Sequence, residues 1–411
     1  MDTGVPRRCA RAPAPPAVYW PALTSAPPRL LVSCGEPSGD LYAAELVREL
    51  RRERPDLAAF GLGGDRLIAQ GVSLLAHVRE LAVIGLVEVV RHIGRLHRIY
   101  RRVLAQVDRT PPDLAVLVDY AGFNLRLARA LSRRGVPVVY YVSPQVWAWR
   151  RGRIRTIRST VRRMLVIFPF EEEFYRQEEV PVTFVGHPLV DLVAPPPDPR
   201  SFLRDQGLDP ERPVIAVLPG SRTQELHYNL PPITGAIRLL AERRPELQFL
   251  IAATPSLDTH PLARSMEGLP VRLVNERTHA VLGSSELALV ASGTATVETA
   301  ILGVPMVVVY RLSPLSYALG RRFVRVPHYS MVNLIAGQAV VPELIQKELT
   351  PERLADQALA LLGDADRASR MRAGLAEVRR RLGAPGASRR AALAVLPWLG
   401  ARPLPPTSNG C

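Results

Sequence analysis

Cysteine is scarce in this sequence, with three residues among 411, at positions 9, 34 and 411. Because they are so few and so scattered, they exclude a disulfide framework and fit a reducing compartment. The eight histidines form no Cys/His cluster with zinc-site spacing. We therefore predict neither a structural disulfide nor a bound metal.

Lysine is nearly absent as well, since Lys347 is the only lysine among 53 basic residues. The net charge of +15 fits a nucleic acid, an anionic membrane or an anionic substrate as partner. A skew this strong toward arginine indicates the codon usage of a GC-rich genome. The number of arginines is therefore weak evidence for arginine chemistry at any site, and a functional arginine has to be identified from its position.

No segment reads as a signal peptide or a membrane span. Arg7 and Arg8 are followed by alanine and proline rather than by an apolar core, so we interpret residues 1–28 as a disordered extension or a misassigned start. Residues 287–310 carry one charge, Glu298, and are long enough to cross a bilayer. Gly293 and the Gly303–Pro305 turn interrupt this run, which predicts a buried strand, a turn, a helix and a second strand.

A chain of 411 residues that is 47% hydrophobic is long enough for two domains. Short runs rich in Val, Leu and Ile alternate with longer helical patterns, which is typical of doubly wound parallel α/β sheets. We predict strands at 30–34, 58–62, 114–119, 136–142, 164–168 and 182–185, and then at 214–218, 249–253, 271–274, 287–291 and 306–310.

A Pro-rich stretch separates the two sets of strands. We therefore predict two Rossmann-like domains that face a cleft, with ligands beyond the carboxyl ends of the strands. The predicted boundaries are an extension at 1–28, a first domain at 29–192, a linker at 193–213, a second domain at 214–345, C-terminal helices at 346–400 and a frayed tail at 401–411.

The first candidate phosphate site follows the predicted strand 214–218. Gly220 allows a tight turn close to a ligand, and Ser221 suits the cap of a helix whose first N–H groups are free to meet a phosphate. Arg222 adds a fork of donors that matches phosphate oxygens. The alternative is a capped helix start with a surface arginine.

A second turn of small residues follows the strand 287–291 and opens another helix. Its N–H groups suit phosphate, and Glu298, inside an otherwise apolar run, suits a ribose diol. The alternative is a glutamate paired with a neighbouring cation. Because the two turns share one predicted sheet, together they predict a nucleotide site that includes Ser292, Gly293, Thr294, Ala295, Thr296 and Glu298.

The first domain offers carboxylates rather than a dinucleotide fingerprint, because the loop 35–40 does not read G-x-G-x-x-G. Glu36 and Asp40 lie in this loop, and Asp119 ends the strand 114–119. Asp119 is well placed as a general base, which contributes about 10²- to 10⁴-fold in rate. Helix capping is the alternative for Asp40 and Asp119.

The segment 88–107 is strongly amphipathic, with arginines at 91, 95, 98 and 102 opposite an apolar stripe. It fits an ordinary surface helix, or a basic surface that faces anionic lipid. The apolar residues 81–87 before it fit either a core helix or a path for acyl chains.

Several longer stretches closely resemble the lipid-A-disaccharide synthase family. They run in the family's order from about Leu30 to Leu361, and the most specific is Ser-Pro-Gln-Val-Trp-Ala-Trp at 143–149. Pro37 departs from the family, which more often has Ala or Thr there. The other matching stretches are 35–40, 81–89, 119–124, 218–222, 291–295 and 332–337.

This resemblance implies a GT-B glycosyltransferase that needs no metal or other cofactor. It implies inverting transfer of 2,3-diacylglucosamine from UDP to the 6-hydroxyl of 2,3-diacylglucosamine 1-phosphate, on the cytoplasmic face of an anionic inner membrane, with no nucleic acid as partner. We expect Asp119 as the base, with Glu36 second. Arg222, Ser221 and the 292–296 turn would stabilise the leaving UDP, and by resemblance Asn333 and Gln338 would face the nucleotide or its sugar.

Three questions stay open at this stage. Another GT-B protein, such as a UDP-N-acetylglucosamine transferase or 2-epimerase, is the nearest rival, although the apolar stretch and Trp147 disfavour it. A basic protein that coats membrane or nucleic acid would leave the two phosphate turns unexplained. The oligomeric state is undetermined, with a homodimer as one option.

Overall fold

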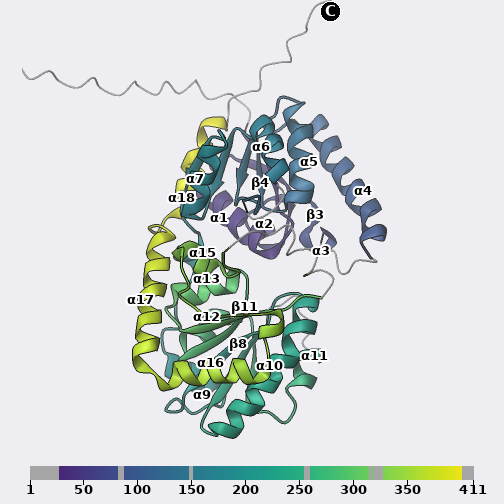
Figure 1. Ribbon diagram of the computed structural model, residues 1–411. Helices are drawn as coiled ribbons and strands as arrows, with labels where there is room; N and C mark the ends of the chain where they lie inside the picture. The colour runs from purple at the N-terminus through teal and green to yellow at the C-terminus, as the bar shows by residue number, and fades with distance from the viewer. Residues whose placement is uncertain are drawn as a thin grey trace, which may run out of the picture.

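The computed structural model describes residues 27–81, 88–147, 151–253, 260–313, 317 and 327–399. Two parallel sheets form two lobes, stacked one above the other in Figure 1. The first sheet has the order β3-β2-β1-β4-β5-β6-β7. Its strands are β1 (Arg29–Ser33), β2 (Ala58–Gly63), β3 (Ser73–His77), β4 (Leu114–Val118), β5 (Val138–Tyr141), β6 (Arg163–Val166) and β7 (Val182–Phe184).

The second sheet repeats this topology with the order β10-β9-β8-β11-β12-β13. Its strands are β8 (Val214–Leu218), β9 (Gln248–Ala253), β10 (Val271–Asn275), β11 (Leu287–Ala291), β12 (Met306–Tyr310) and β13 (Glu343–Ile345). In both sheets the chain order reverses between two central strands, β1 and β4 or β8 and β11. Such reversals open a crevice at the carboxyl ends of the strands, where α/β proteins bind ligands.

Most predicted strands are confirmed, because the central strands are buried along their whole length, as a sheet covered on both faces requires. The predicted set lacked β3 and β13, which are edge strands and only partly buried. The run 287–310 forms β11, helix α13 and β12, as predicted. No described helix is both long enough and apolar enough to cross a membrane.

Helices cover both sheets and connect the parallel strands. Those of the first half are α1 (Pro37–Glu53), α2 (Asp65–Ala69), α3 (Val78–Leu81), α4 (Glu88–Arg109), α5 (Ala121–Ser132), η1 (Arg151–Arg153), α6 (Ile154–Thr160), α7 (Pro169–Gln177) and α8 (Leu189–Leu192). Those of the second half are α9 (Pro199–Asp205), α10 (Thr223–Arg243), α11 (His260–Ser265), α12 (Thr278–Gly283), α13 (Thr294–Ile301) and α15 (Met331–Ala336). The C-terminal ones are η2 (Gln346–Glu348), α16 (Pro351–Gly363), α17 (Ala365–Arg381), α18 (Ala387–Val395) and η3 (Leu396–Trp398).

The C-terminal helices connect the two lobes. Helix α17 packs against α13 and α15 of the second lobe, and α18 packs against α1 of the first. The Asp191 carboxylate accepts hydrogen bonds from the backbone N–H groups of Gly386 (2.7 Å) and Ala387 (3.1 Å), where α18 begins. The predicted linker 193–213 contains α9, whose buried Phe202 and Leu203 belong to a hydrophobic core. The domain boundaries themselves stay a prediction.

Candidate active site

The end of β1 positions Glu36. The chain turns at Gly35, and α1 starts at Pro37 with Glu36 as its N-cap in an extended conformation. The Tyr120 ring lies directly over Gly35, so that a Cβ atom on Gly35 would come within 2.3 Å of Tyr120 Cγ. Only glycine fits here, and the close contact brings the loop after β1 against the loop after β4.

The end of β4 positions Asp119 in an unusual backbone conformation. Asp119 and Tyr120 have φ angles of 45° and 48°, in the left-handed region that non-glycine residues rarely adopt. Asn124 Nδ2 lies 2.9 Å from the Asp119 carbonyl oxygen and 3.1 Å from that of Ser33, and the Tyr140 hydroxyl also donates to the Asp119 carbonyl. Such strained conformations persist where the surroundings hold them, and they are common at functional sites.

The electrostatics of Asp119 suit a base. Burial and the nearby negative charge of Glu36 raise the pKa of its carboxyl from 3.8 to about 6, against smaller lowering effects from the Tyr120 backbone and Arg222. An ionised carboxylate with a pKa just below neutrality is a stronger proton acceptor than an ordinary aspartate. The influence of Arg222 is notable because this residue comes from the other lobe.

The loop after β8 reaches across to the first lobe through Arg222. Arg222 Nη2 lies 2.9 Å from Glu36 Oε2, and its Nη1 lies 3.2 Å from Glu225 Oε1 in its own lobe. Gly220, with φ of 135°, makes the turn, and the backbone N–H of Ser221 donates to Glu225 Oε2 at 2.9 Å. The structure thus brings Asp119, Glu36 and Arg222 into one electrostatic cluster.

The turn after β11 leaves the start of α13 open. Gly293 and Thr294 are exposed, while the Ser292 hydroxyl donates to the Tyr329 carbonyl at 3.0 Å. The Thr296 side chain is buried and its hydroxyl donates back to the Gly293 carbonyl at 2.7 Å. The exposed residues Gly293 and Thr294 lie at the start of this eight-residue helix, and phosphate binding by its N–H groups stays a prediction.

The Glu298 carboxylate lies beside a histidine side chain. His279 Nε2 lies 3.5 Å from Glu298 Oε1, the arrangement of the alternative raised from the sequence. The Glu298 side chain is 19% exposed. A role in binding a ribose stays a prediction.

Asn333 is placed to shape a loop. It is 1% exposed, and its side-chain Oδ1 accepts from the backbone N–H groups of Val340 (2.7 Å) and Val341 (3.0 Å). Its Nδ2 donates to the Val341 carbonyl and to Glu343 Oε1. Because its amide is fully used within the chain, Asn333 positions the segment that carries exposed Gln338.

Asp40 proves to be a helix cap. It is 4% exposed, and its carboxylate accepts from the backbone N–H groups of Gly64 (2.6 Å), Arg66 (3.1 Å) and Leu67 (3.3 Å) at the start of α2. The capping alternative is thereby confirmed, although the helix capped is α2 and not its own helix. Asp364 likewise caps α17, where its carboxylate accepts from the Arg367 backbone N–H at 2.9 Å.

Two contributors to the site were missed from the sequence. Glu225 lies three residues after the N-cap Arg222. At this spacing a glutamate side chain can accept hydrogen bonds from backbone N–H groups at the helix start, so its capping role could have been predicted from the sequence. The contacts of Asn124 join strands that are distant in sequence, and no local pattern indicates them.

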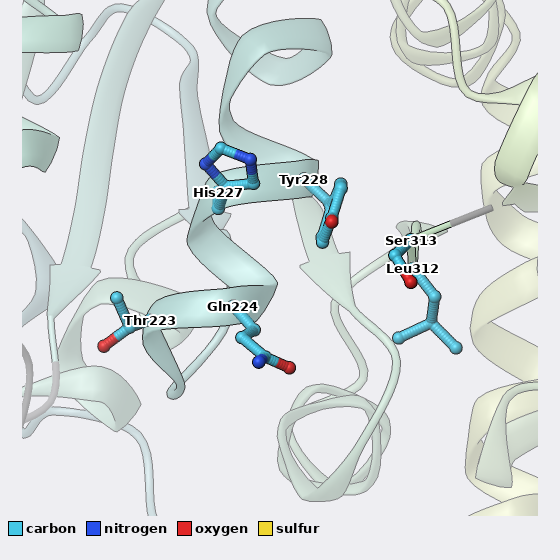
Figure 2. A pocket seen from close by; sticks show the side chains of 6 residues that line it. All are labelled: Thr223, Gln224, His227, Tyr228, Leu312 and Ser313. Atoms are coloured by element: carbon cyan, nitrogen blue, oxygen red, sulfur yellow. The ribbon is translucent and has the colours of Figure 1, made fainter. Parts of the chain in front are cut away.

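A cavity of about 270 Å³ also opens beside the first turn of α10 (Figure 2), lined by Thr223, Gln224, His227, Tyr228, Leu312 and Ser313.

Comparison with known proteins gives a consistent picture. Residues 30–396 match the model of the family described as "Lipid-A-disaccharide synthetase". The lipid-A-disaccharide synthase of Myxococcus xanthus is 47% identical over 375 residues, covering 91% of this chain and 98% of the relative. That of Geobacter sulfurreducens is 45% identical over 375 residues, covering 90% and 97%.

Solved structures share the fold at low sequence identity. A UDP-GlcNAc 2-epimerase from Neisseria meningitidis, bound to UDP-GlcNAc, matches with a TM-score of 0.62 and 13% identity, covering 90% of this chain and 100% of the other. A structure described as the glycotransferase of kitacinnamycin matches with a TM-score of 0.60 and 16% identity, covering 92% and 100%. The fold therefore does not separate a transferase from an epimerase, whereas the sequence relatives do.

Proposed function

The chain belongs to the lipid-A-disaccharide synthase family of GT-B glycosyltransferases, and on that premise we propose which residues carry out the transfer and where. The substrates are UDP-2,3-diacylglucosamine as donor and 2,3-diacylglucosamine 1-phosphate as acceptor. The observation that carries the assignment is the ion pair between Arg222 of the second lobe and Glu36 of the first, beside Asp119. This ion pair supports the assignment of a base in the first lobe and a phosphate-binding cation in the second.

Asp119 acts as the general base. Its carboxylate takes the proton of the acceptor 6-hydroxyl while that oxygen bonds to the anomeric carbon of the donor, and the bond between this carbon and the diphosphate oxygen breaks. Attack on the face opposite the leaving group inverts the anomeric centre and gives a β-1,6 linkage. Burial, with the nearby charge of Glu36, keeps the pKa of Asp119 high, and Glu36 is the second candidate for the base.

The leaving UDP gains negative charge as this bond breaks. The guanidinium of Arg222, the N–H of Ser221 and the start of α13 supply hydrogen-bond donors and positive potential for it. Gly220 and Gly293 let the backbone approach the diphosphate, and Gln338 lies on the loop that Asn333 holds. These groups provide the stabilisation that a metal ion supplies in other glycosyltransferases.

Helix α4 is the proposed contact with the membrane. Ile99, Val103 and Val107 are buried in the core of the first lobe, so this part of its apolar stripe packs inside the protein. Arg95, Arg98 and Arg102 are exposed and free to face anionic lipid on the cytoplasmic side of the inner membrane. Of the predicted acyl-chain path at 81–87, Leu81 is buried in the first lobe and residues 82–87 lie outside the described residues.

Turnover of the two diacylated substrates tests this function directly. The purified chain, given both substrates and EDTA, should release UDP and form the disaccharide 1-phosphate, detected by mass spectrometry. Conversion of UDP-N-acetylglucosamine to its 2-epimer, assayed in parallel, tests the rival activity. Absence of the disaccharide with an intact, UDP-binding protein would overturn the proposal.

A further inference from the structure

The donors of the first phosphate turn are engaged by the protein's own carboxylates. Glu225 Oε2 accepts the Ser221 N–H at 2.9 Å, and Glu225 Oε1 lies 3.2 Å from Arg222 Nη1. The second nitrogen of the guanidinium, Nη2, contacts Glu36 at 2.9 Å. Both kinds of donor that the turn offers to a diphosphate, a backbone N–H and a guanidinium, are therefore already paired with carboxylate oxygens.

The turn is shaped around Glu225. A Cβ atom on Gly220 would lie 2.6 Å from Glu225 Cβ and 2.8 Å from its Oε2, so the glutamate side chain lies directly against the glycine. The Glu225 side chain is 14% exposed, whereas that of Arg222 is 63% exposed. The carboxylate is thus the more buried partner of the pair, and the guanidinium is the partner that a ligand can reach from solvent.

A diphosphate requires the same donors and carries the same sign of charge. Phosphate oxygens pair with arginine and backbone N–H groups in the geometry that carboxylates use. Glu36 and Glu225 already share this guanidinium, and the negative charge of each carboxylate repels a diphosphate bound there, so the Glu225 charge lowers the affinity for the nucleotide.

We propose that the Glu225 carboxylate competes with the donor's diphosphate for Arg222 and the Ser221 N–H. It pairs with both groups while no nucleotide is bound, and it pairs with them again when UDP leaves. This inference rests on the proposed UDP-sugar site. Glu225 is then a positioning residue that favours product release, because its carboxylate replaces the diphosphate as the partner of Arg222 and the Ser221 N–H. The cost is a weaker affinity for the nucleotide.

The test compares the wild-type chain with Glu225→Gln. Glutamine has the same shape and still accepts the Ser221 N–H, but it lacks the charge that competes for Arg222. Isothermal titration with UDP should show Kd lowered by roughly three- to tenfold. Stopped-flow displacement of a fluorescent UDP analogue should show slower release by a similar factor.

The matched control is Glu242→Gln, which removes the same charge from an exposed position near the other end of α10. It should leave both the affinity and the release rate within about twofold of wild type. If Glu225 served only to order the turn, Glu225→Gln would bind UDP equally well or more weakly than wild type. That result, with an unchanged melting temperature, overturns the inference. A wild-type chain that binds no UDP would instead refute the proposed nucleotide site.

Discussion

Replacement of Asp119 by Asn should make the protein both inactive and more stable. Asparagine has nearly the same shape and tolerates the left-handed backbone of this position. It cannot accept a proton, so kcat should fall by about 10²- to 10⁴-fold, which corresponds to a barrier higher by about 3 to 5 kcal/mol. The affinity for UDP should be retained, because Asp119 is not among the groups proposed to bind the diphosphate.

The gain in stability follows from the raised pKa. The fold moves the pKa of Asp119 from 3.8 to about 6, so the folded protein favours the neutral carboxyl. The stability from this preference is fully present below pH 4 and is lost as the pH rises through 6. At pH 7 the ionised carboxylate therefore costs on the order of 2–3 kcal/mol, which an uncharged asparagine avoids.

Two assays separate these effects. Disaccharide formation should be nearly abolished in Asp119→Asn, and thermal unfolding should show a higher Tm than wild type at pH 7 but an equal Tm at pH 4. In the wild type, kcat should fall as the pH drops through about 6, because the base becomes protonated. Retention of more than a tenth of wild-type turnover by Asp119→Asn would refute the reasoning and point to Glu36 as the base.

Three further substitutions test neighbouring parts of the site. Glu36→Gln removes the like charge that helps to raise the pKa of Asp119, so the acidic limb of the pH–rate profile should move to lower pH; an unmoved limb argues against coupling of the two carboxylates. Arg222→Ala should raise the Kd for UDP at least about tenfold, as titration calorimetry will show, since it removes a charge-assisted partner of the diphosphate. Gly35→Ala should cost several degrees in Tm and most of the activity, because its Cβ would collide with the Tyr120 ring; wild-type behaviour would mean that this ring moves freely.

The central strands could be predicted because burial on both faces requires unbroken runs of branched apolar residues. The strands 214–218 and 287–291 coincide with β8 and β11 for this reason. The edge strand β3 escaped prediction because it is largely half-buried and its sequence carries polar ends. The return of α18 to the first lobe depends on contacts such as Asp191 with Gly386, which are 195 residues apart and leave no local pattern.

The site could be predicted in part for a related reason. In parallel sheets the strand ends mark where ligands bind, so Glu36, Asp119 and Arg222 stood out as charged residues that follow apolar runs. What each side chain contacts could not be predicted. The Asn333 side-chain amide forms hydrogen bonds with the Val340 and Val341 backbone and with Glu343. These contacts exist only once the loop has folded against β13, so the sequence does not indicate them.

The ion pair between Arg222 and Glu36 supports the proposal that a base and a cation from different lobes belong to one mechanism. Arg222 lowers the pKa of Asp119 and is itself paired with Glu36, which raises it. On the proposed assignment, a diphosphate that takes the guanidinium would remove the counter-charge of Glu36 and leave its repulsion of the Asp119 carboxylate less screened. Asp119 would then be a stronger proton acceptor in the donor complex than in the free protein, through charge alone.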